Sequence, residues 1–370
     1  MTRPRLLARS DARDQGATIK DVAALAGVSV ATVSRVLNEK GLVREDTVRR
    51  VLDAAKELNY VPHGGARSLS TRRTSTVGVV LPDLHGEFFS EVIRGIDVAA
   101  RHSGYHLLVS GSHSDWNEMA AVLLAVRGRV DGLIVMAPEL EAERIASRLP
   151  GGLAVVLLNC RADGAWSVAI DNSRGVASMM DHLFSLGHRE IAFIAGPDGN
   201  ADAAERLRAW EEAMGDGRAT ALDEILVRGD FSENAGYDAA NTLLSRGRRP
   251  TAIFGANDAM AIGALCAIRE RGVRVPEELA VVGFDDIPIA RFVSPPLTTV
   301  SVEIAELGRS AFDLLLEASR SDGRDARLET FPTHLVIRES CGTHARSPDG
   351  TTEPKSKQSS TFNQRQEELS

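Results

Sequence analysis

The sequence of 370 residues is long enough for two or three domains, and its 43% hydrophobic and 25% charged residues are ordinary for a water-soluble globular protein. Residues 1–76 hold 14 Lys or Arg against 8 Asp or Glu, whereas the remainder holds 29 against 43, so a basic head that nucleic acid would attract precedes an acidic body. Three scattered cysteines (Cys160, Cys266 and Cys341) exclude a disulfide framework, and without a signal peptide or a membrane-spanning apolar run we expect a cytoplasmic protein.

Residues 1–16 are polar and Arg-rich without hydrophobic periodicity, so we expect a disordered tail. The first predicted helix follows Thr18, which can cap it, with Asp21 in the capping-box position. Its apolar residues recur at helical spacing and are Ile19, Val22, Ala23 and Ala26. Gly27 then permits a left-handed turn because it has no side chain to clash.

A second short helix is predicted after its cap, Ser29. Its inner side carries Val33, Val36 and Leu37, and its outer side carries Val30, Ala31, Ser34 and Arg35. Two short helices joined by a tight Gly turn are typical of a helix-turn-helix, whose second helix lies in the major groove of DNA. Small outer residues suit close approach to base edges, whereas the outer face of a plain helical bundle is usually charged.

A third amphipathic segment completes a predicted three-helix domain of about 45 residues. The residues assigned to its inner face are Val48, Val51, Leu52, Ala55 and Leu58.

These segments resemble the DNA-binding domain of the lactose-repressor (LacI) family. The resemblance is carried by the runs 18–23, 26–29 and 32–38, and it continues through about Arg338. It implies that residues 17–62 form the DNA-binding domain. The DNA contacts implied in and just after this domain are Thr18, Ser29, Val30, Ala31, Thr32, Ser34, Arg35, Asn38, Tyr60, Ala66 and Leu69.

Residues 63–75 match a family hinge that is disordered alone and helical on operator DNA. The family leucine that wedges into the minor groove corresponds to Leu69. Where the family usually has Asn-Ala-Leu, this chain has His63, Gly64 and Gly65. Because two glycines cost roughly 1 kcal/mol each in a helix, hinge folding is expected to be harder or to begin later. A plain Gly/Ser/Arg linker is the alternative.

From Thr76 the pattern changes to short apolar strands alternating with amphipathic helices, and it restarts after Asp171. The predicted strands are 77–81, 105–109, 132–135, 154–158, 191–195, 225–227, 252–254 and 279–283. The predicted helices are 89–103, 116–127, 140–149, 173–186, 202–214, 232–245 and 258–271. This alternation predicts an α/β fold with two similar lobes, each a parallel sheet with helices on both faces. The body thus resembles the two-lobed periplasmic binding proteins, which hold ligands in a cleft beyond the carboxyl ends of their strands.

The last predicted helix, 300–316, is one that the family places in the first lobe, and a final strand, 335–337, would join the second. The effector-binding and dimerisation core is therefore expected to span residues 76–342. Lobe 1 would comprise about 76–171 and 300–327, and lobe 2 about 172–299 and 328–340, with several crossings forming the hinge between them. Residues 343–370 are polar and are expected to form a disordered tail.

Eight candidate ligand-binding residues lie near the ends of predicted strands: Phe88, Phe89, Asn159, Asp171, Arg206, Phe231, Asn257 and Asp285. In the family, aromatic residues matching Phe88 and Phe89 contact the effector, although either could equally pack in the core. The preceding residues 85–87 are His-Gly-Glu where the family usually has Ser-Asn-Pro, so this loop is expected to read a different ligand.

Arg206 matches the family's effector-binding arginine, which bonds a sugar hydroxyl or a carboxylate. The alternative is a surface salt bridge with Glu205 or Glu211. Phe231 matches an aromatic that stacks on the ligand, and Asp285 matches an acid that holds ligand hydroxyls.

The remaining candidates are amides and acids at loop positions. Asn257 can both donate and accept, and Asp258 is expected to cap the next helix. Asn159 and Asp171 would be either ligand contacts or loop caps. The whole set suits a neutral polyhydroxylated ligand such as a sugar, while a purine or an organic acid remains open.

Four common enzyme motifs are absent from the sequence. There is no G-x-G-x-x-G after the first strand, no G-x-x-x-x-G-K-[ST] loop, no G-x-S-x-G elbow and no H-E-x-x-H pair. His85, His113 and His188 are isolated. We therefore expect neither catalysis nor a cofactor nor a metal.

The expected function is that of a transcriptional regulator. We expect a homodimer that binds palindromic operator DNA and represses a catabolic operon under the control of a small-molecule effector, with a sugar as the expected ligand. The alternative is a corepressor-dependent regulator responding to a purine or an organic acid. A solute-binding protein without DNA function is disfavoured, because the chain has a DNA-binding head and no export signal.

Overall fold

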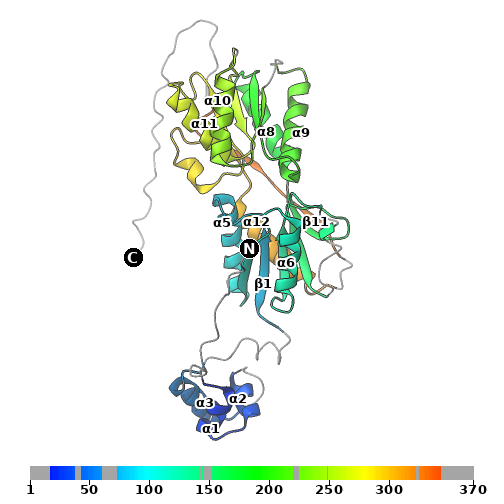
Figure 1. Cartoon of the computed structure of the whole chain (residues 1–370), viewed down its shortest axis with the longest axis vertical. Coiled ribbons are helices and arrows are strands. Elements are labelled where there is room, and N and C mark those ends of the chain that lie inside the picture. Colours follow the sequence, from blue (N-terminus) through cyan, green and yellow to red (C-terminus); the bar gives the residue numbers. More distant parts are fainter. Residues whose placement is uncertain are drawn as a thin grey trace, which may run out of the picture. The chain divides into compact units, whose positions relative to one another are not determined.

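A computed structural model describes residues 17–37, 43–60, 73–141, 144–145, 152–219, 225–247, 249–321 and 325–342 (Figure 1). The chain divides into two compact units, one holding residues up to 168 together with 308–329, and the other holding 169–307 and the residues from 330. We call the second unit lobe 2, and the part of the first unit from residue 73 onward lobe 1. The predictions for Asn38, for residues 63–72 of the hinge, which include Ala66 and Leu69, and for both tails lie outside the described residues.

The head contains α1 (Ile19–Ala26), α2 (Val30–Leu37) and α3 (Glu45–Glu57). Gly27 ends α1 in the left-handed conformation at φ +63°, and the next N–H, of Val28, donates to the Ala23 carbonyl. The three helices share an apolar core that includes Val22, Val33 and Val51. The predicted helix-turn-helix is thus confirmed, including the role of the glycine.

The assignment of Leu52 to the inner face of the third helix is wrong. Leu52 is 50% exposed, and Ala54 is buried instead. Successive helical residues are turned by 100°, so a residue next to Val51 points away from the core that Val51 enters. Residues three and four positions further on, Ala54 and Ala55, return to that side.

Lobe 1 is built on a six-stranded sheet in the order β11-β5-β4-β3-β1-β2. Its elements are β1 (Thr76–Leu81), α5 (Glu87–His102), β2 (His106–Gly111), α6 (Trp116–Val126), β3 (Gly132–Met136), β4 (Ala154–Leu158), β5 (Trp166–Ile170) and β11 (Leu328–Phe331). The pairs from β2 to β5 are parallel, as the alternation predicts.

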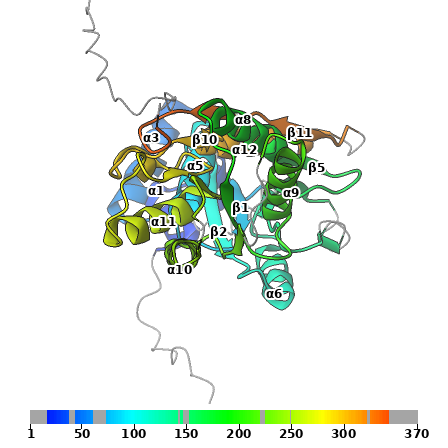
Figure 2. The same cartoon turned by 90° about the horizontal axis from the view of Figure 1, so that it is seen from above.

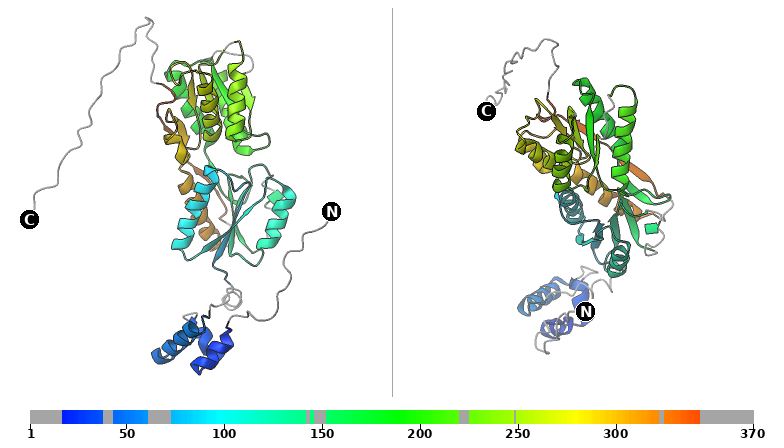
Figure 3. Two further views of the ribbon diagram at one scale, coloured as in Figure 1. Left: turned by 60° about the vertical axis from the view of Figure 1, so that its left-hand side comes forward. Right: turned by 45° about the horizontal axis from the view of Figure 1, so that its top comes forward.

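Helices cover both faces of this sheet (Figure 3). On one face α6 contributes Met119, Leu123 and Val126 to a core shared with the strands. On the other face lie α5 and α12 (Ile304–Ala318), and the Leu315 side chain of α12 lies directly over Gly132. The sheet is therefore buried on both sides, which explains its continuous apolar strands.

Lobe 2 has a four-stranded parallel sheet in the order β7-β6-β8-β9. Its elements are α8 (Asn172–Ser185), β6 (Ile191–Ala195), α9 (Ala201–Gly215), β7 (Leu226–Arg228), α10 (Glu233–Leu244), β8 (Ala252–Gly255), α11 (Asp258–Glu270), β9 (Ala280–Val282) and the short 3₁₀ helix η1 (Pro288–Arg291). Seen from above, α8 and α9 lie on one side of this lobe and α10 and α11 on the other (Figure 2).

Three strands were not predicted: β5, β10 (Thr299–Ser301) and β11. The helix expected to begin at residue 300 begins at Ile304, because Val300 belongs to β10 and pairs antiparallel with β12 (His334–Val336). The boundaries between the two units fall inside β5, α12 and β11, so the chain passes from one unit to the other within these three elements. None of the described helices combines the length and apolar composition that crossing a bilayer requires.

Helices α10 and α11 approach each other closely through two glycines. A Cβ added to Gly263 would lie 1.9 Å from the Glu233 carbonyl oxygen, and one added to Gly236 would lie 2.0 Å from the Met260 carbonyl oxygen. Each contact is with backbone, which cannot swing aside as a side chain can. This face of lobe 2 therefore requires glycine at both positions.

Gly263→Ala is expected to lower the free energy of unfolding of lobe 2 by about 1–3 kcal/mol, because the new methyl group overpacks the helix contact. Gly215→Ala is the matched control, since nothing lies within 4 Å of a Cβ at that helical glycine. The control should be neutral or stabilising by up to about 1 kcal/mol. Urea unfolding followed by circular dichroism measures both, and equal losses would contradict the close packing.

Candidate functional site

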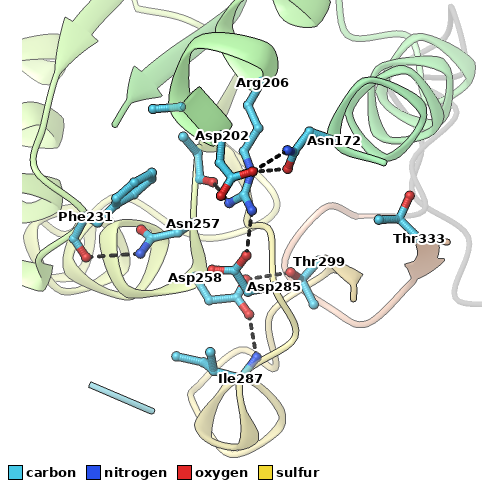
Figure 4. A network of polar contacts seen from close by, with 12 residues as sticks. Asn172, Asp202, Arg206, Phe231, Asn257, Asp258, Asp285, Ile287, Thr299 and Thr333 are labelled. Atoms are coloured by element: carbon cyan, nitrogen blue, oxygen red, sulfur yellow. Dashed lines mark hydrogen bonds and ion pairs between the residues drawn. The ribbon is translucent and has the colours of Figure 1, made fainter. Parts of the chain in front are cut away.

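Arg206, on α9, is the centre of a buried polar network in lobe 2 (Figure 4). The residue is only 3% exposed. Its Nε donates to Asn172 Oδ1 at 2.8 Å and its Nη1 donates to the Ala256 carbonyl at 2.6 Å. Its Nη2 lies 3.0 Å from Asp285 Oδ1. The alternative of a surface salt bridge is therefore wrong: the guanidinium is paired inside the lobe.

The ring of Phe284 supports the same guanidinium from one side, with the Arg206 Cζ 3.8 Å from the ring centroid. A cation over an aromatic face is attracted by the ring quadrupole. The plane of the guanidinium is thus fixed by a ring, an amide, a carbonyl and a carboxylate.

Asp285 follows β9 and is 5% exposed. Its backbone has φ +110°, which a residue other than glycine rarely adopts, and its N–H donates to the Val300 carbonyl at 2.8 Å. Burial raises the pKa of this carboxyl to about 6, although the neighbouring Arg206 acts to lower it. The contact with Arg206 is an ion pair, and no well-formed hydrogen bond from a described residue reaches Oδ1.

Asp258 lies beside this pair and is completely buried. Its carboxylate oxygens accept from the Thr299 hydroxyl at 2.5 Å and from the Ile287 N–H at 2.9 Å. Burial and the nearby charge of Asp285 raise the pKa of Asp258 well above its ordinary value. Asp258 therefore ties the loop after β9 to the start of α11.

The prediction that Asp258 caps α11 is wrong by one residue. Asn257 is the N-cap, and its Oδ1 accepts from the Met260 N–H at 2.9 Å. Its Nδ2 donates to the Phe231 carbonyl at 3.0 Å. The side chain of Asn257 thus joins the end of β8 to the loop after β7.

Phe231 has a left-handed backbone at φ +72°, and its ring lies against Gly196. A Cβ at Gly196 would lie 2.4 Å from the ring, so this position must be glycine for the ring to lie there. The ring is half-buried. It therefore keeps one part free to contact a flat or apolar ligand surface.

Asn172 is a member of the network that the sequence did not single out. It is buried at the start of α8, and its Nδ2 donates to Asp202 Oδ1 at 2.7 Å and to Glu205 Oε2 at 3.2 Å. Recognition of β5 as a strand would have pointed to it, because polar residues just beyond a parallel strand lie at the ligand edge. Its neighbour Asp171 caps α8, so the cap interpretation of that candidate is confirmed.

The structure therefore brings four predicted ligand residues of lobe 2 to the same edge of its parallel sheet: Arg206, Phe231, Asn257 and Asp285. Their donors, acceptors and aromatic face can hold a small polar molecule. Within the described residues, no group of three or more His, Cys, Asp or Glu side chains is arranged to hold a metal ion.

The lobe 1 candidates lie near the carboxyl ends of their own strands. Phe88 and Phe89 are half-buried in the first turn of α5, with ring centroids 5.7 Å apart in edge-to-face geometry. Asn159 follows β4 with φ +53° and is 4% exposed. Neither its Nδ2 nor its Oδ1 has a hydrogen-bond partner among the described residues. A buried amide without partners is costly, and a bound ligand would satisfy it.

The predicted DNA contacts in the described part of the head differ in exposure. Ser29, Val30, Ala31 and Arg35 are exposed on and just before α2, while Thr32 and Ser34 are half-buried. The Ser29 hydroxyl accepts from the Thr32 N–H at 3.2 Å and so caps α2. The exposed side chains of α2 are therefore small, except for that of Arg35.

Two further predicted DNA contacts have structural partners in the head. The Thr18 N–H and hydroxyl donate to the Asp21 carboxylate at 2.8 and 2.7 Å, which lowers the pKa of Asp21. Tyr60 is half-buried and packs against the head core.

Comparison with known proteins matches both parts of the chain. Residues 18–63 match the family of bacterial regulatory proteins, lacI family, and residues 180–341 match a periplasmic binding protein-like domain. The HTH-type transcriptional repressor PurR of Edwardsiella ictaluri is 37% identical over 331 residues, which cover 88% of this chain and 96% of that protein.

Two solved structures are similar over the same extent. A lac repressor dimer bound to operator and the anti-inducer ONPF is 31% identical with a TM-score of 0.81, covering 88% of this chain and 99% of that one. The transcriptional regulator CelR in complex with cellobiose is 32% identical with a TM-score of 0.66, again covering 88% and 99%.

Asp285→Asn is expected to remove a pH dependence of stability. The pKa of Asp285 is raised in the folded protein, so the fold binds this proton more tightly than the unfolded chain does. Its contribution is present at low pH and is lost as the pH rises through about 6. The stability of the wild type relative to Asp285→Asn should fall by about 2–3 kcal/mol between about pH 4 and pH 7.

Urea unfolding at a series of pH values measures this difference. Asp230→Asn is the control of opposite sign, because hydrogen bonds from Ser232 lower the pKa of Asp230. Against that control, wild-type stability should rise as the pH increases through the acidic range. A difference between the wild type and Asp285→Asn that does not change with pH would contradict the raised pKa.

Arg35→Ala should weaken binding to a duplex selected by the wild-type chain from a random library, by about 1–3 kcal/mol if Arg35 contacts base edges. Arg50→Ala removes the same charge from the exposed side of α3 and is the control. Competition between the selected duplex and a scrambled one measures sequence preference, which only Arg35→Ala should reduce. Equal preference in both variants would place the reading surface elsewhere.

Proposed function

The chain belongs to the LacI family of DNA-binding transcriptional repressors, and from that premise we propose that a small polar molecule held at the Arg206 network controls its binding to operator DNA. The observation that carries the proposal is the buried pair of Arg206 and Asp285 at the carboxyl edge of a parallel sheet. Ligands of open α/β sheets bind at this edge.

The network keeps unused hydrogen-bonding capacity for a ligand. A guanidinium has five N–H groups, and the contacts of Arg206 with Asn172, Ala256 and Asp285 use one at each of its three nitrogens. Asp285 Oδ1 accepts no well-formed hydrogen bond from the described residues. A ligand that carries both a donor and an acceptor satisfies the two side chains together.

The charges of the network favour a neutral ligand over an acid. Asp202 and Glu205 accept from Asn172, and Asp285 pairs with Arg206, so a further carboxylate would meet repulsion from three acidic side chains of the network. A sugar places hydroxyl groups against Asp285 and an apolar face on Phe231. The similarity to CelR with cellobiose supports this choice.

A purine is the second candidate. Its ring N–H groups and ring nitrogens suit Asp285 and Arg206, and its flat face suits the half-buried Phe231 ring. The similarity to the HTH-type transcriptional repressor PurR supports this candidate.

The proposed control follows from linkage. The chain acts as a homodimer on a palindromic operator, because the single helix-turn-helix among its described residues reads only a half-site. An effector changes operator affinity only if it binds more tightly to one of two arrangements of the dimer.

The regulated genes are proposed to form a catabolic operon whose enzymes act on the same molecule. A footprint over a single asymmetric half-site would contradict the dimer.

Arg206→Lys tests the ligand site better than removal of the side chain. Alanine would leave Asp285 buried without its cation, which costs about 3–5 kcal/mol and threatens the fold. Lysine keeps the charge but loses the planar fork that reaches several groups at once. We expect Arg206→Lys to keep operator affinity and lose the response to effector.

The experiment has two stages. Thermal shifts with neutral mono- and disaccharides, including cellobiose, and with purine bases identify the ligand class. Affinity for the selected operator is then measured with and without the saturating ligand. Arg218→Lys is the matched control, because Arg218 is likewise an ion-paired arginine of lobe 2, with Asp181 and Asp216, but it lies on the surface. An Arg206→Lys variant that responds as Arg218→Lys does would show that the ligand binds elsewhere.

A further inference from the structure

Asp131 holds the two residues that lead into the first strand of lobe 1. Its Oδ1 accepts from the Thr74 N–H at 2.6 Å and from the Thr74 hydroxyl at 2.8 Å, and its Oδ2 accepts from the Ser75 N–H at 2.9 Å. The partners are 56 and 57 residues apart in sequence. Three hydrogen bonds to one ionised side chain make a specific long-range tie.

The backbone at this point is fixed from both neighbouring strands. The Ser75 carbonyl accepts from the His106 N–H of β2 at 2.9 Å, and the Asp131 N–H donates to the Thr76 carbonyl at 2.8 Å. Ser75 adopts a left-handed φ of +50°, which a residue other than glycine keeps only where its surroundings hold it. The Asp131 carboxylate supplies that restraint.

These hydrogen bonds lie where the chain enters lobe 1, so they can affect more than the stability of the lobe. Thr74 and Ser75 are among the first described residues after the segment that joins lobe 1 to the head, which ends its described part at Tyr60. They lie at the amino end of β1, whereas the ligand candidates Phe88 and Phe89 follow its carboxyl end. Strand β1 therefore connects the ligand edge of lobe 1 to the point where the chain leaves for the DNA-binding head.

We propose that Asp131 is a positioning residue for operator binding. By holding Thr74 and Ser75 it sets the place and direction in which the chain leaves lobe 1 toward the head. Two heads read two half-sites only at the right separation, so a loose exit from the lobe lowers the fraction of dimers ready to bind. The inference goes beyond ligand control, because it concerns operator affinity without any ligand.

The test compares three variants of the full chain, Asp131→Ala, Asp131→Asn and Thr74→Val, with the matched control Asp115→Ala. Asp115 is also in lobe 1 and accepts two backbone hydrogen bonds at the start of α6, from Asn117 and Glu118, but it does not touch the exit segment. Affinity for the duplex selected by the wild type is measured without ligand at fixed salt. Hydrogen exchange is followed at the Thr74 and Ser75 amides and throughout lobe 1.

Asp131→Ala is expected to weaken operator binding by about tenfold, within the usual range of coupling between sites. Exchange of the Thr74 and Ser75 amides should accelerate by about tenfold, because each loses a charge-assisted hydrogen bond. Asp131→Asn should show a smaller loss and Thr74→Val the smallest, since it removes one bond of three. Asp115→Ala should bind DNA as the wild type does.

The proposal is overturned if Asp131→Ala, at the same thermal stability, binds operator as Asp115→Ala does. It is also overturned if exchange accelerates evenly across lobe 1, which would mark Asp131 as a structural residue only. If Asp131→Ala does not fold, Asp131→Asn and Thr74→Val decide by the same two measurements. Failure to find any ligand would count against the proposed effector control and would leave this test intact.

Discussion

The ion pair between Arg206 and Asp285 is the interaction that organises the ligand edge of lobe 2. A buried guanidinium is expensive unless its N–H groups are satisfied, so the lobe must bring partners to it. They come from the start of α8 through Asn172, from the end of β8 through the Ala256 carbonyl, and from the loop after β9 through Asp285. Folding of the lobe and assembly of the ligand edge are therefore the same event.

The loops around this pair adopt costly conformations that the network maintains. Phe231 and Asp285 have positive φ angles, and each is held by a neighbour: Asn257 donates to the Phe231 carbonyl, and Asp285 donates its N–H to Val300. Gly283 completes the arrangement, because a Cβ there would lie 2.2 Å from Asp258 Oδ1. Such strain is typical of residues positioned for binding rather than for stability.

Much of this architecture could be predicted from the sequence, because it depends on local patterns. Helical spacing and Gly27 determine the head, and the alternation of strands with helices determines both sheets. The strands β10 and β11 were not predicted because they are short segments whose pairing partners are distant in sequence. Strand β5 pairs with the preceding strand β4, but its run Trp-Ser-Val-Ala-Ile is interrupted by a serine and is not a continuous apolar segment. The sequence predicts Arg206 and Asp285 as ligand residues, but it does not predict that they pair with each other. It also does not indicate that Asn172 and Asp258 belong to the site. Those roles depend on contacts between residues tens of positions apart, which no local pattern contains.

Calorimetric titration of the identified ligand at about pH 6, in buffers of different ionisation enthalpy, tests whether the ligand meets Asp285. A ligand that donates a hydrogen bond to this carboxylate favours its ionised form, so binding should release up to about half a proton per chain when the pKa is about 6. The binding heat should then depend on the buffer, and this dependence should vanish in Asp285→Asn. Tight binding with a heat independent of the buffer in the wild type would contradict a site built on the Arg206–Asp285 pair.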